Sequence, residues 1–143
     1  MKKQSNTACP CQSGASYAAC CEVYHRGQLA DSAEKLMRSR YCAFAKGKVS
    51  YLIKTTHPQG ASFEQNTIQW RKSLKAHCKS TQFVGLQILG KRDDSPTTAT
   101  VTFHASLMRN GQDVSFTEKS KFEKVQGRWL YLEPSDLKIE KPW

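Results

Sequence analysis

Four cysteines lie within the thirteen residues from Cys9 to Cys21, and their spacing is the feature of this chain most able to support chemistry. Cys9 and Cys11 flank a proline, and Cys20 and Cys21 follow after an interval of eight residues. A tetrahedral zinc ion needs four soft ligands at about 2.3 Å. Gly14 allows the chain to reverse between the two pairs, because glycine takes a positive φ without strain. The pattern predicts a zinc knuckle with Cys9, Cys11, Cys20 and Cys21 as ligands.

The predicted ligand set has one substitute and two alternatives. Cys20 and Cys21 are expected at the first turn of a short helix, and His25, four residues after Cys21, is a reserve ligand. Instead of binding zinc, the cysteines could form two disulfides or remain free thiols, but clustered cysteines in a reducing compartment favour metal. Four protein ligands leave no open position for water, so the zinc would be structural. Lys or Arg side chains are expected nearby, because four thiolates need screening.

Length and charge limit the class of protein. The 143 residues suffice for one domain with a core and a small appended module. The formal net charge is +10, from 22 Lys and Arg against 12 Asp and Glu. Such a balance favours acidic partners, such as an acidic protein face or the ribosome. Because the chain has no run of five like charges and no basic stretch interleaved with aromatic residues, we expect at most weak, non-specific binding to nucleic acid.

The N-terminal residues indicate the compartment. Lys2 and Lys3 are followed by polar residues and not by an apolar stretch, so no signal peptide is predicted. No apolar window reaches the ~18 residues that a bilayer-spanning helix requires. We expect a cytoplasmic protein that does not bind a membrane.

Three helices are predicted by capping and periodicity. The first should begin near Ala33, where residues 31–34 resemble a capping box, and should stop at Gly47. The second is expected over 49–56, because the residue before Pro58 avoids the helical conformation. The third, over 63–78, has aromatic and apolar residues on one face.

Beyond the third helix the apolar period becomes that of strands. We expect a strand in which Val84, Leu86 and Ile88 share a face, a turn over 93–96, and strands over 98–107, 114–122 and 129–133. Asn110-Gly111 and Gln126-Gly127 are two-residue hairpin signals.

The first hairpin fixes a register. It pairs Arg109 with Gln112, which sets Phe103 opposite Glu118 and Val101 opposite Ser120 and leaves the apolar rows on one face. Helices followed by a curved antiparallel sheet make an α+β domain.

Two charged residues interrupt the apolar faces. Arg40 shares a helix face with Leu36 and Phe44, and Glu118 lies among the core-facing residues of its strand. Because a lone buried charge is costly, the two should pair directly or through another group. The side chains expected to line the same cavity are Tyr41, His57, Ser120 and Tyr131.

Two interpretations of these charges remain open. Arg40 and Glu118 could form the polar floor of a ligand pocket, with His57 as an acid or base. They could instead form a structural ion pair, with His57 exposed at a helix end. The sequence contains no set of nucleophile, base and orienting group, so we assign no catalytic residue.

The remaining cysteines and leucines suggest packing roles. Cys42 and Cys78 are interpreted as buried free thiols, which pack as small hydrophobic side chains. Leu130 and Leu132 face away from Trp129 and Tyr131. They would pack under the knuckle, under the C-terminal tail or against a second subunit, so a dimer is a hypothesis and the oligomeric state stays open.

Three segments together resemble a known family. The run Cys9-Pro10-Cys11-Gln12-Ser13-Gly14, with Tyr17 and Cys20-Cys21, resembles the SEC-C motif, a zinc knuckle at the end of the bacterial translocase ATPase SecA. With residues 36–44 (LMRSRYCAF) and 51–58 (YLIKTTHP), the chain resembles the YchJ-like family. The resemblance implies a SEC-C knuckle over 1–29, a cone-shaped nuclear-transport-factor-2-like (NTF2-like) domain over 30–143, and no established activity.

These observations lead to competing functions. In the first, the chain is a zinc-binding adaptor that contacts proteins of secretion or translation, as the SEC-C resemblance and the positive charge suggest. The alternative is a small-molecule binder, or an isomerase-like or dehydratase-like enzyme, that uses the cone cavity around Arg40 and Glu118. Simple RNA binding is a third hypothesis.

Overall fold

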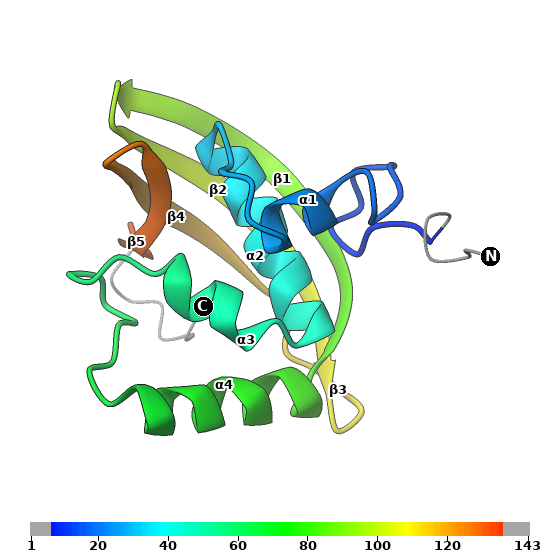
Figure 1. Cartoon of the computed structure of the whole chain (residues 1–143). Coiled ribbons are helices and arrows are strands. Elements are labelled where there is room, and N and C mark those ends of the chain that lie inside the picture. Colours follow the sequence, from blue (N-terminus) through cyan, green and yellow to red (C-terminus); the bar gives the residue numbers. More distant parts are fainter. Residues whose placement is uncertain (1–6, 136–143) are drawn as a thin grey trace.

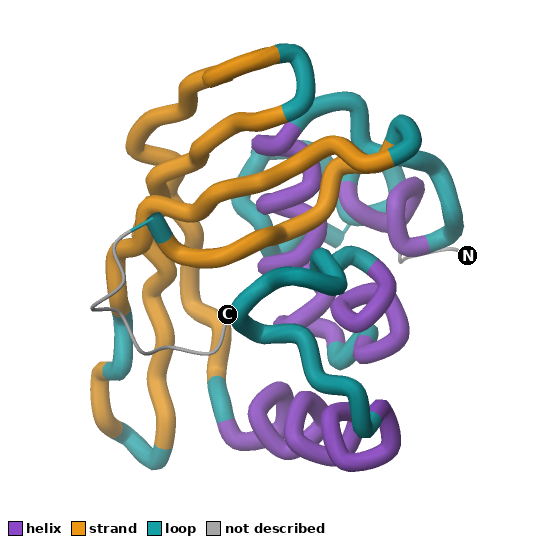
Figure 2. Tube along the Cα trace, turned by 90° about the vertical axis from the view of Figure 1, so that its left-hand side faces the viewer, coloured by secondary structure: helices purple, strands orange, loops and turns teal. Residues whose placement is uncertain are grey.

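A computed structural model describes residues 7–135; Lys2, Lys3 and the segment 136–143 lie outside the described residues. The helices are α1 (Cys21–His25), α2 (Ala33–Lys46), α3 (Val49–Lys54) and α4 (Thr67–Ser80). The strands are β1 (Gln82–Ser95), β2 (Thr98–Arg109), β3 (Gln112–Asp113), β4 (Phe116–Val125) and β5 (Arg128–Pro134). Figure 1 shows a curved sheet with α2 lying across it, and Figure 2 separates the strands from the helices as two layers. No helix within 7–135 is long and apolar enough to cross a membrane.

Helix α2 forms as the capping residues predict. The Ser32 hydroxyl accepts a hydrogen bond from the backbone N–H of Lys35 at 3.1 Å, and Gly47 ends the helix at a φ of 71°. One face of the helix is buried against the sheet, including Met37, Tyr41 and Phe44.

Helix α3 ends at Lys54, two residues before the predicted end. Beyond it the backbone joins the edge of β5, where the Tyr131 N–H donates to the Thr55 carbonyl and the His57 N–H donates to the Tyr131 carbonyl, both at 2.8 Å. A tertiary backbone pairing therefore replaces the last helical turn.

The predicted start of the third helix is wrong by four residues. Helix α4 begins at Thr67 because the Asn66 side chain caps it, accepting from the Gln69 N–H at 3.1 Å. Phe63, which was expected inside the helix, precedes it and packs edge-on against Trp70 with ring centroids 5.2 Å apart.

The sheet has the order β1-β2-β4-β5, with β3 paired to β2, and all these pairs are antiparallel. The predicted register is confirmed: Arg109 pairs with Gln112, Phe103 with Glu118 and Val101 with Ser120. Both predicted two-residue turns are present. Asn110 and Gly111 have φ of 53° and 75°, and Gln126 and Gly127 have φ of 52° and 81°.

Two predictions about β1 are wrong. The strand continues through the acidic residues 93–94 to Ser95, and the turn falls at residues 96–97. A bulge between Phe83 and Gly85 shifts the alternation, so Phe83 packs on the core and Val84 is 57% exposed.

The cysteine knuckle shares the core of the larger domain. Cys9, Cys11 and Cys21 belong to the same buried cluster as Tyr41 of α2 and Phe103 of β2. The fold therefore places the thiols against α2 and does not leave them on a separate lobe.

Substitution of Gly60 tests the contact between the α3–α4 connection and β5. A Cβ at this position would collide with the carbonyl oxygen of Leu132. We expect Gly60→Ala to lower the free energy of unfolding by about 1–3 kcal/mol, because backbone must move to admit the methyl group. Denaturant unfolding measures the loss. The matched control is Gly90→Ala, whose Cβ would meet nothing within 4 Å, and equal midpoints for the two variants would contradict the contact.

Candidate metal centre and buried polar cluster

The four predicted thiols converge on one point. The Sγ atoms of Cys9, Cys11, Cys20 and Cys21 all lie within 4.8 Å of one another. Two of the separations are 3.6 Å (Cys11 to Cys20) and 3.9 Å (Cys20 to Cys21). Ligands at 2.3 Å from a tetrahedral ion lie ~3.8 Å apart, so the spacing is compatible with zinc. All six cysteines are free, which gives the disulfide alternative no support.

Local backbone bonds shape the knuckle as the sequence suggests. The Gln12 N–H donates to the Cys9 carbonyl and the Cys9 N–H donates to the Ala15 carbonyl, both at 3.0 Å. Gly14 takes a φ of 98° at the reversal. The second pair of thiols then comes from the start of α1, which begins at Cys21.

Arg38 supplies the positive charge expected beside the thiols. Its Nη1 donates to the Cys11 carbonyl at 2.9 Å and lies 3.9 Å from the Cys11 Sγ, while its Nε donates to Glu34 at 3.0 Å. A zinc ion with four thiolates carries net negative charge, which this guanidinium offsets. Bound zinc would supply a rigid cross-link between the loop and α1.

His25, the reserve ligand, is engaged elsewhere. Its Nε2 donates to the Ser39 carbonyl at 2.9 Å, and its Nδ1 accepts from the Tyr17 hydroxyl at 2.7 Å. Burial lowers the pKa of His25, which favours the neutral ring that these two bonds require. In this arrangement His25 connects the knuckle to α2 and offers no free nitrogen to a metal.

Further contacts hold the knuckle on the domain. The Gln12 side chain bonds the backbone of β1 at the bulge: its Nε2 donates to the Val84 carbonyl at 3.4 Å and its Oε1 accepts from the Leu86 N–H at 3.3 Å. Lys46 of α2 lies over the Tyr17 ring, 4.3 Å from its centroid.

Cys42 is a fifth thiol that the sequence reasoning missed. It is fully buried, as predicted, but its Sγ lies 3.8 Å from the Cys9 Sγ, directly beside the four-cysteine cluster. The available signal was its position four residues after Arg38, which places both side chains on one face of α2.

Arg40 and Glu118 meet through Tyr131. The Arg40 guanidinium lies 4.8 Å from the centroid of the Tyr131 ring. The Tyr131 hydroxyl donates to Glu118 at 2.8 Å, and Ser120 donates to the same carboxylate oxygen at 2.6 Å. Arg40 Nη1 also donates to Thr55 at 2.8 Å. The structure thus brings together four of the six predicted pocket residues.

These charges are deeply buried. Arg40 and Glu118 are 2% and 1% exposed. Burial lowers the pKa of Arg40 to about 10 and raises the pKa of Glu118. Such exposure is typical of a packed polar cluster and not of the walls of an open pocket.

The other two predicted pocket residues lie elsewhere. Tyr41 packs edge-on against Phe83 of β1, with centroids 5.7 Å apart. His57 donates from Nε2 to Glu123 at 2.7 Å and accepts at Nδ1 from the Gln59 N–H at 3.0 Å. It is 6% exposed, so its expected exposure at a helix end is wrong.

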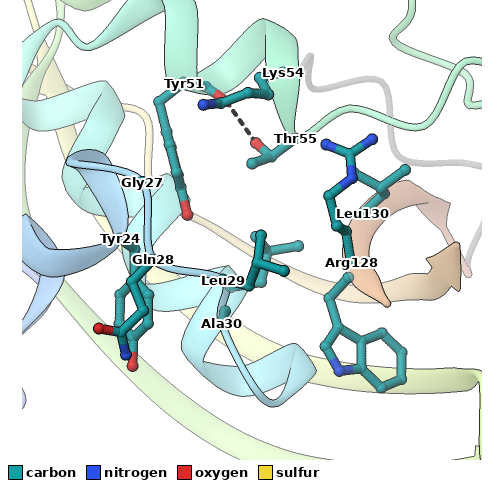
Figure 3. Close-up of a pocket in the computed structure, with 12 residues that line it drawn as sticks. Tyr24, Gly27, Gln28, Leu29, Ala30, Tyr51, Lys54, Thr55, Arg128 and Leu130 are labelled. Carbon is teal, nitrogen blue, oxygen red and sulfur yellow. Dashed lines mark hydrogen bonds between the residues drawn. The ribbon is translucent and has the colours of Figure 1, made fainter. Parts of the chain in front are cut away.

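A cavity of about 180 Å³ lies between the knuckle and the domain. It is lined by residues 27–30, by α3 and by the start of β5, and Figure 3 shows Lys54 and Arg128 along one side with Leu29 and Ala30 opposite. The Nε1 of Trp129, which also lines it, is buried and has no hydrogen-bond partner among the described residues. Leu130 is 3% exposed here, covered by its own chain.

Comparisons with known proteins agree with this architecture. The sequence matches the family profile of the YchJ middle NTF2-like domain over residues 32–134 and that of the SEC-C motif over residues 6–22. A UPF0225 protein of Streptomyces coelicolor is 44% identical over 128 residues, covering 87% of this chain and 92% of that protein.

Two solved structures are similar over most of the chain. A SEC-C motif containing protein from Rhodopseudomonas palustris is 33% identical with a TM-score of 0.76, covering 92% of this chain and 98% of that one. A SEC-C motif containing protein from Psychrobacter arcticus is 30% identical with a TM-score of 0.77, covering 92% and 84%. The α+β, NTF2-like fold expected from the resemblance is confirmed.

Metal removal should destabilise the whole chain. Because three of the thiols lie in the shared core, stripping zinc from the metal-loaded protein with a chelator should lower the melting temperature in a single transition. Calorimetry with and without chelator measures the shift. The control is Cys9→Ala, whose melting should not respond to chelator. A separate early transition that leaves the main one unchanged would contradict the shared core.

Stability should also depend on the ionisation of Glu118. Since its folded-state pKa is raised above the ordinary 4.5, the folded chain binds this proton more tightly and stability should fall as pH rises from 4.5 through the folded-state pKa. Glu118→Gln keeps an acceptor but cannot ionise, so it should be more stable than wild type at neutral pH and similar at about pH 4. Denaturant unfolding across pH tests this, with exposed Glu64→Gln as control. A less stable Glu118→Gln at neutral pH would contradict it.

Proposed function

Because the chain belongs to the YchJ family of SEC-C motif proteins, we propose that it is a zinc-stabilised binding protein that docks on a partner of translation or secretion, with the ribosome as the first candidate. The structural zinc holds the knuckle in place, and the surface beside the knuckle makes the contact. The knuckle is a scaffold in this proposal, because Cys9, Cys11 and Cys21 are buried and turn inward.

The main support for the proposal is the cavity between the knuckle and the domain, which we call the junction cavity. Lys54 is exposed and Arg128 is half-buried, and neither forms an ion pair with another residue of 7–135. Two uncommitted cations beside an apolar wall that contains Leu29, which is 55% exposed, suit an acidic segment that also presents an apolar side chain. The net charge of +10 would speed the approach to any acidic partner.

The small-molecule or enzymatic alternative has less support. It depends on access to Arg40 and Glu118, and both are almost fully buried. Non-specific RNA binding differs from the docking proposal in one respect: it would use exposed cations anywhere on the surface, such as Lys72 and Lys79 of α4.

Co-sedimentation with purified bacterial ribosomes tests the proposal. We expect wild type to sediment with ribosomes at low salt and Lys54→Glu/Arg128→Glu to lose at least about tenfold in affinity, because two contacts become repulsive. The control, Lys72→Glu/Lys79→Glu on α4, makes the same change in net charge away from the cavity. It should lose much less.

Three outcomes decide between the functions. Equal losses in the two double variants would support non-specific electrostatic binding and contradict a site at the junction. Binding that is unchanged in Cys9→Ala would contradict the role of the zinc scaffold. No sedimentation of wild type at low salt would remove the ribosome as a partner.

A further inference from the structure

We propose that Cys42 is a ligand of the metal centre and competes with Cys20 for the fourth coordination position. Cys9, Cys11 and Cys21 would ligate in both states. The inference depends on metal binding and not on the partner, so a negative ribosome experiment leaves it standing.

The position of Cys42 matches that of a ligand. Its Sγ lies 3.8 Å from the Cys9 Sγ, the ~3.8 Å edge of a tetrahedron with zinc–sulfur bonds of about 2.3 Å. Cys42 therefore contacts one of the three shared ligands directly, and it is held there by the backbone of α2.

Four of these five thiols are buried, and the fifth, Cys20, is only partly buried. Cys9, Cys11, Cys21 and Cys42 are 3%, 0%, 1% and 0% exposed. Cys20 is half-buried, and its Sγ lies 3.2 Å from the exposed Ser13 hydroxyl. A thiolate in water is well solvated without a metal, whereas a buried thiolate is costly unless it is coordinated. This difference would favour Cys42 as the fourth ligand, with Cys20 left to the solvent.

The environment of Cys20 suits a thiol that can be released. Cys20 lines a cleft of about 380 Å³ together with Lys35, Arg38 and Lys91. The cleft would leave a released Cys20 accessible to a soft electrophile while the metal stays bound. In the Cys42-bound state the metal would also tie the knuckle directly to α2, instead of joining only the loop and α1.

Single and double substitutions test the exchange. We expect Cys20→Ala and Cys42→Ala each to retain one zinc per chain, since the other thiol takes the fourth position, while Cys20→Ala/Cys42→Ala loses at least about tenfold more affinity than either. Zinc content after competition with a chelator measures this, and the intensity of sulfur-to-cobalt absorption in the Co²⁺-substituted protein counts the thiolates. Cys78→Ala, which removes a thiol outside the cluster, should match wild type.

The proposal fails if Cys20→Ala loses zinc as completely as Cys9→Ala, or if the double variant binds zinc as well as Cys20→Ala. Circular dichroism of each variant shows whether a loss of zinc reflects unfolding.

Alkylation of the zinc-loaded protein gives a second measurement that does not depend on a substitution folding. Iodoacetamide forms a sulfur–carbon bond with the thiolate as iodide leaves. Because Cys78 is a second half-buried free thiol, peptide mapping must locate the modification: native mass spectrometry should find wild type modified at Cys20 with zinc still bound, whereas Cys42→Ala modified at Cys20 should lack zinc. Protection of Cys20 until zinc has dissociated would overturn the exchange.

Discussion

The structure depends on the position of α2 between the knuckle and the sheet. One face of this helix packs Tyr41 and Phe44 against the strands, and another presents Arg38 and Cys42 to the cysteine cluster. The knuckle is too small to bury its own thiols, so they are buried against apolar side chains of α2 and β1. In return, the cysteine loop covers part of the core that would otherwise face water. Loss of either partner would expose the other.

The contacts across this junction are polar as well as apolar, which makes the arrangement specific. Tyr17, His25, Ser39 and Tyr51 form a continuous chain of hydrogen bonds from the knuckle through α2 to α3. At the β1 bulge, the Gln12 side-chain amide forms hydrogen bonds with the Val84 carbonyl and the Leu86 N–H. Each bond satisfies a group that would be costly to bury alone, so the knuckle has one favourable orientation on the domain.

Sequence reasoning succeeded where chemistry is local. Asn110-Gly111 determines a turn by itself, and the register of β2 against β4 follows from that turn. The four thiols of the knuckle and the capping of α2 are equally local. The start of α4 was misjudged because Phe63 continues the apolar pattern although Asn66 is the stronger helix start. The burial of His57 and the nearness of Cys42 to Cys9 depend on segments far apart in the chain, which periodicity cannot place.

The charges of Arg40 and Glu118 illustrate what a pattern can and cannot assign. Their positions on apolar faces predicted that they would be buried and would meet, and the structure joins them through Tyr131. The same pattern could not distinguish a ligand pocket from a packed cluster, because both need polar groups inside. Their low exposure, together with the hydrogen bonds that join Arg40 to Thr55 and one Glu118 oxygen to Ser120 and Tyr131, favours a structural role. The proposed recognition would then use outward-facing groups. Among the residues of 7–135 that line the junction cavity, Lys54 and Arg128 are the cations without an ion-pair partner. In the proposed zinc-bound protein, the metal would hold α1 and residues 27–30 in place as a wall of that cavity, so the ion would influence binding without touching the partner.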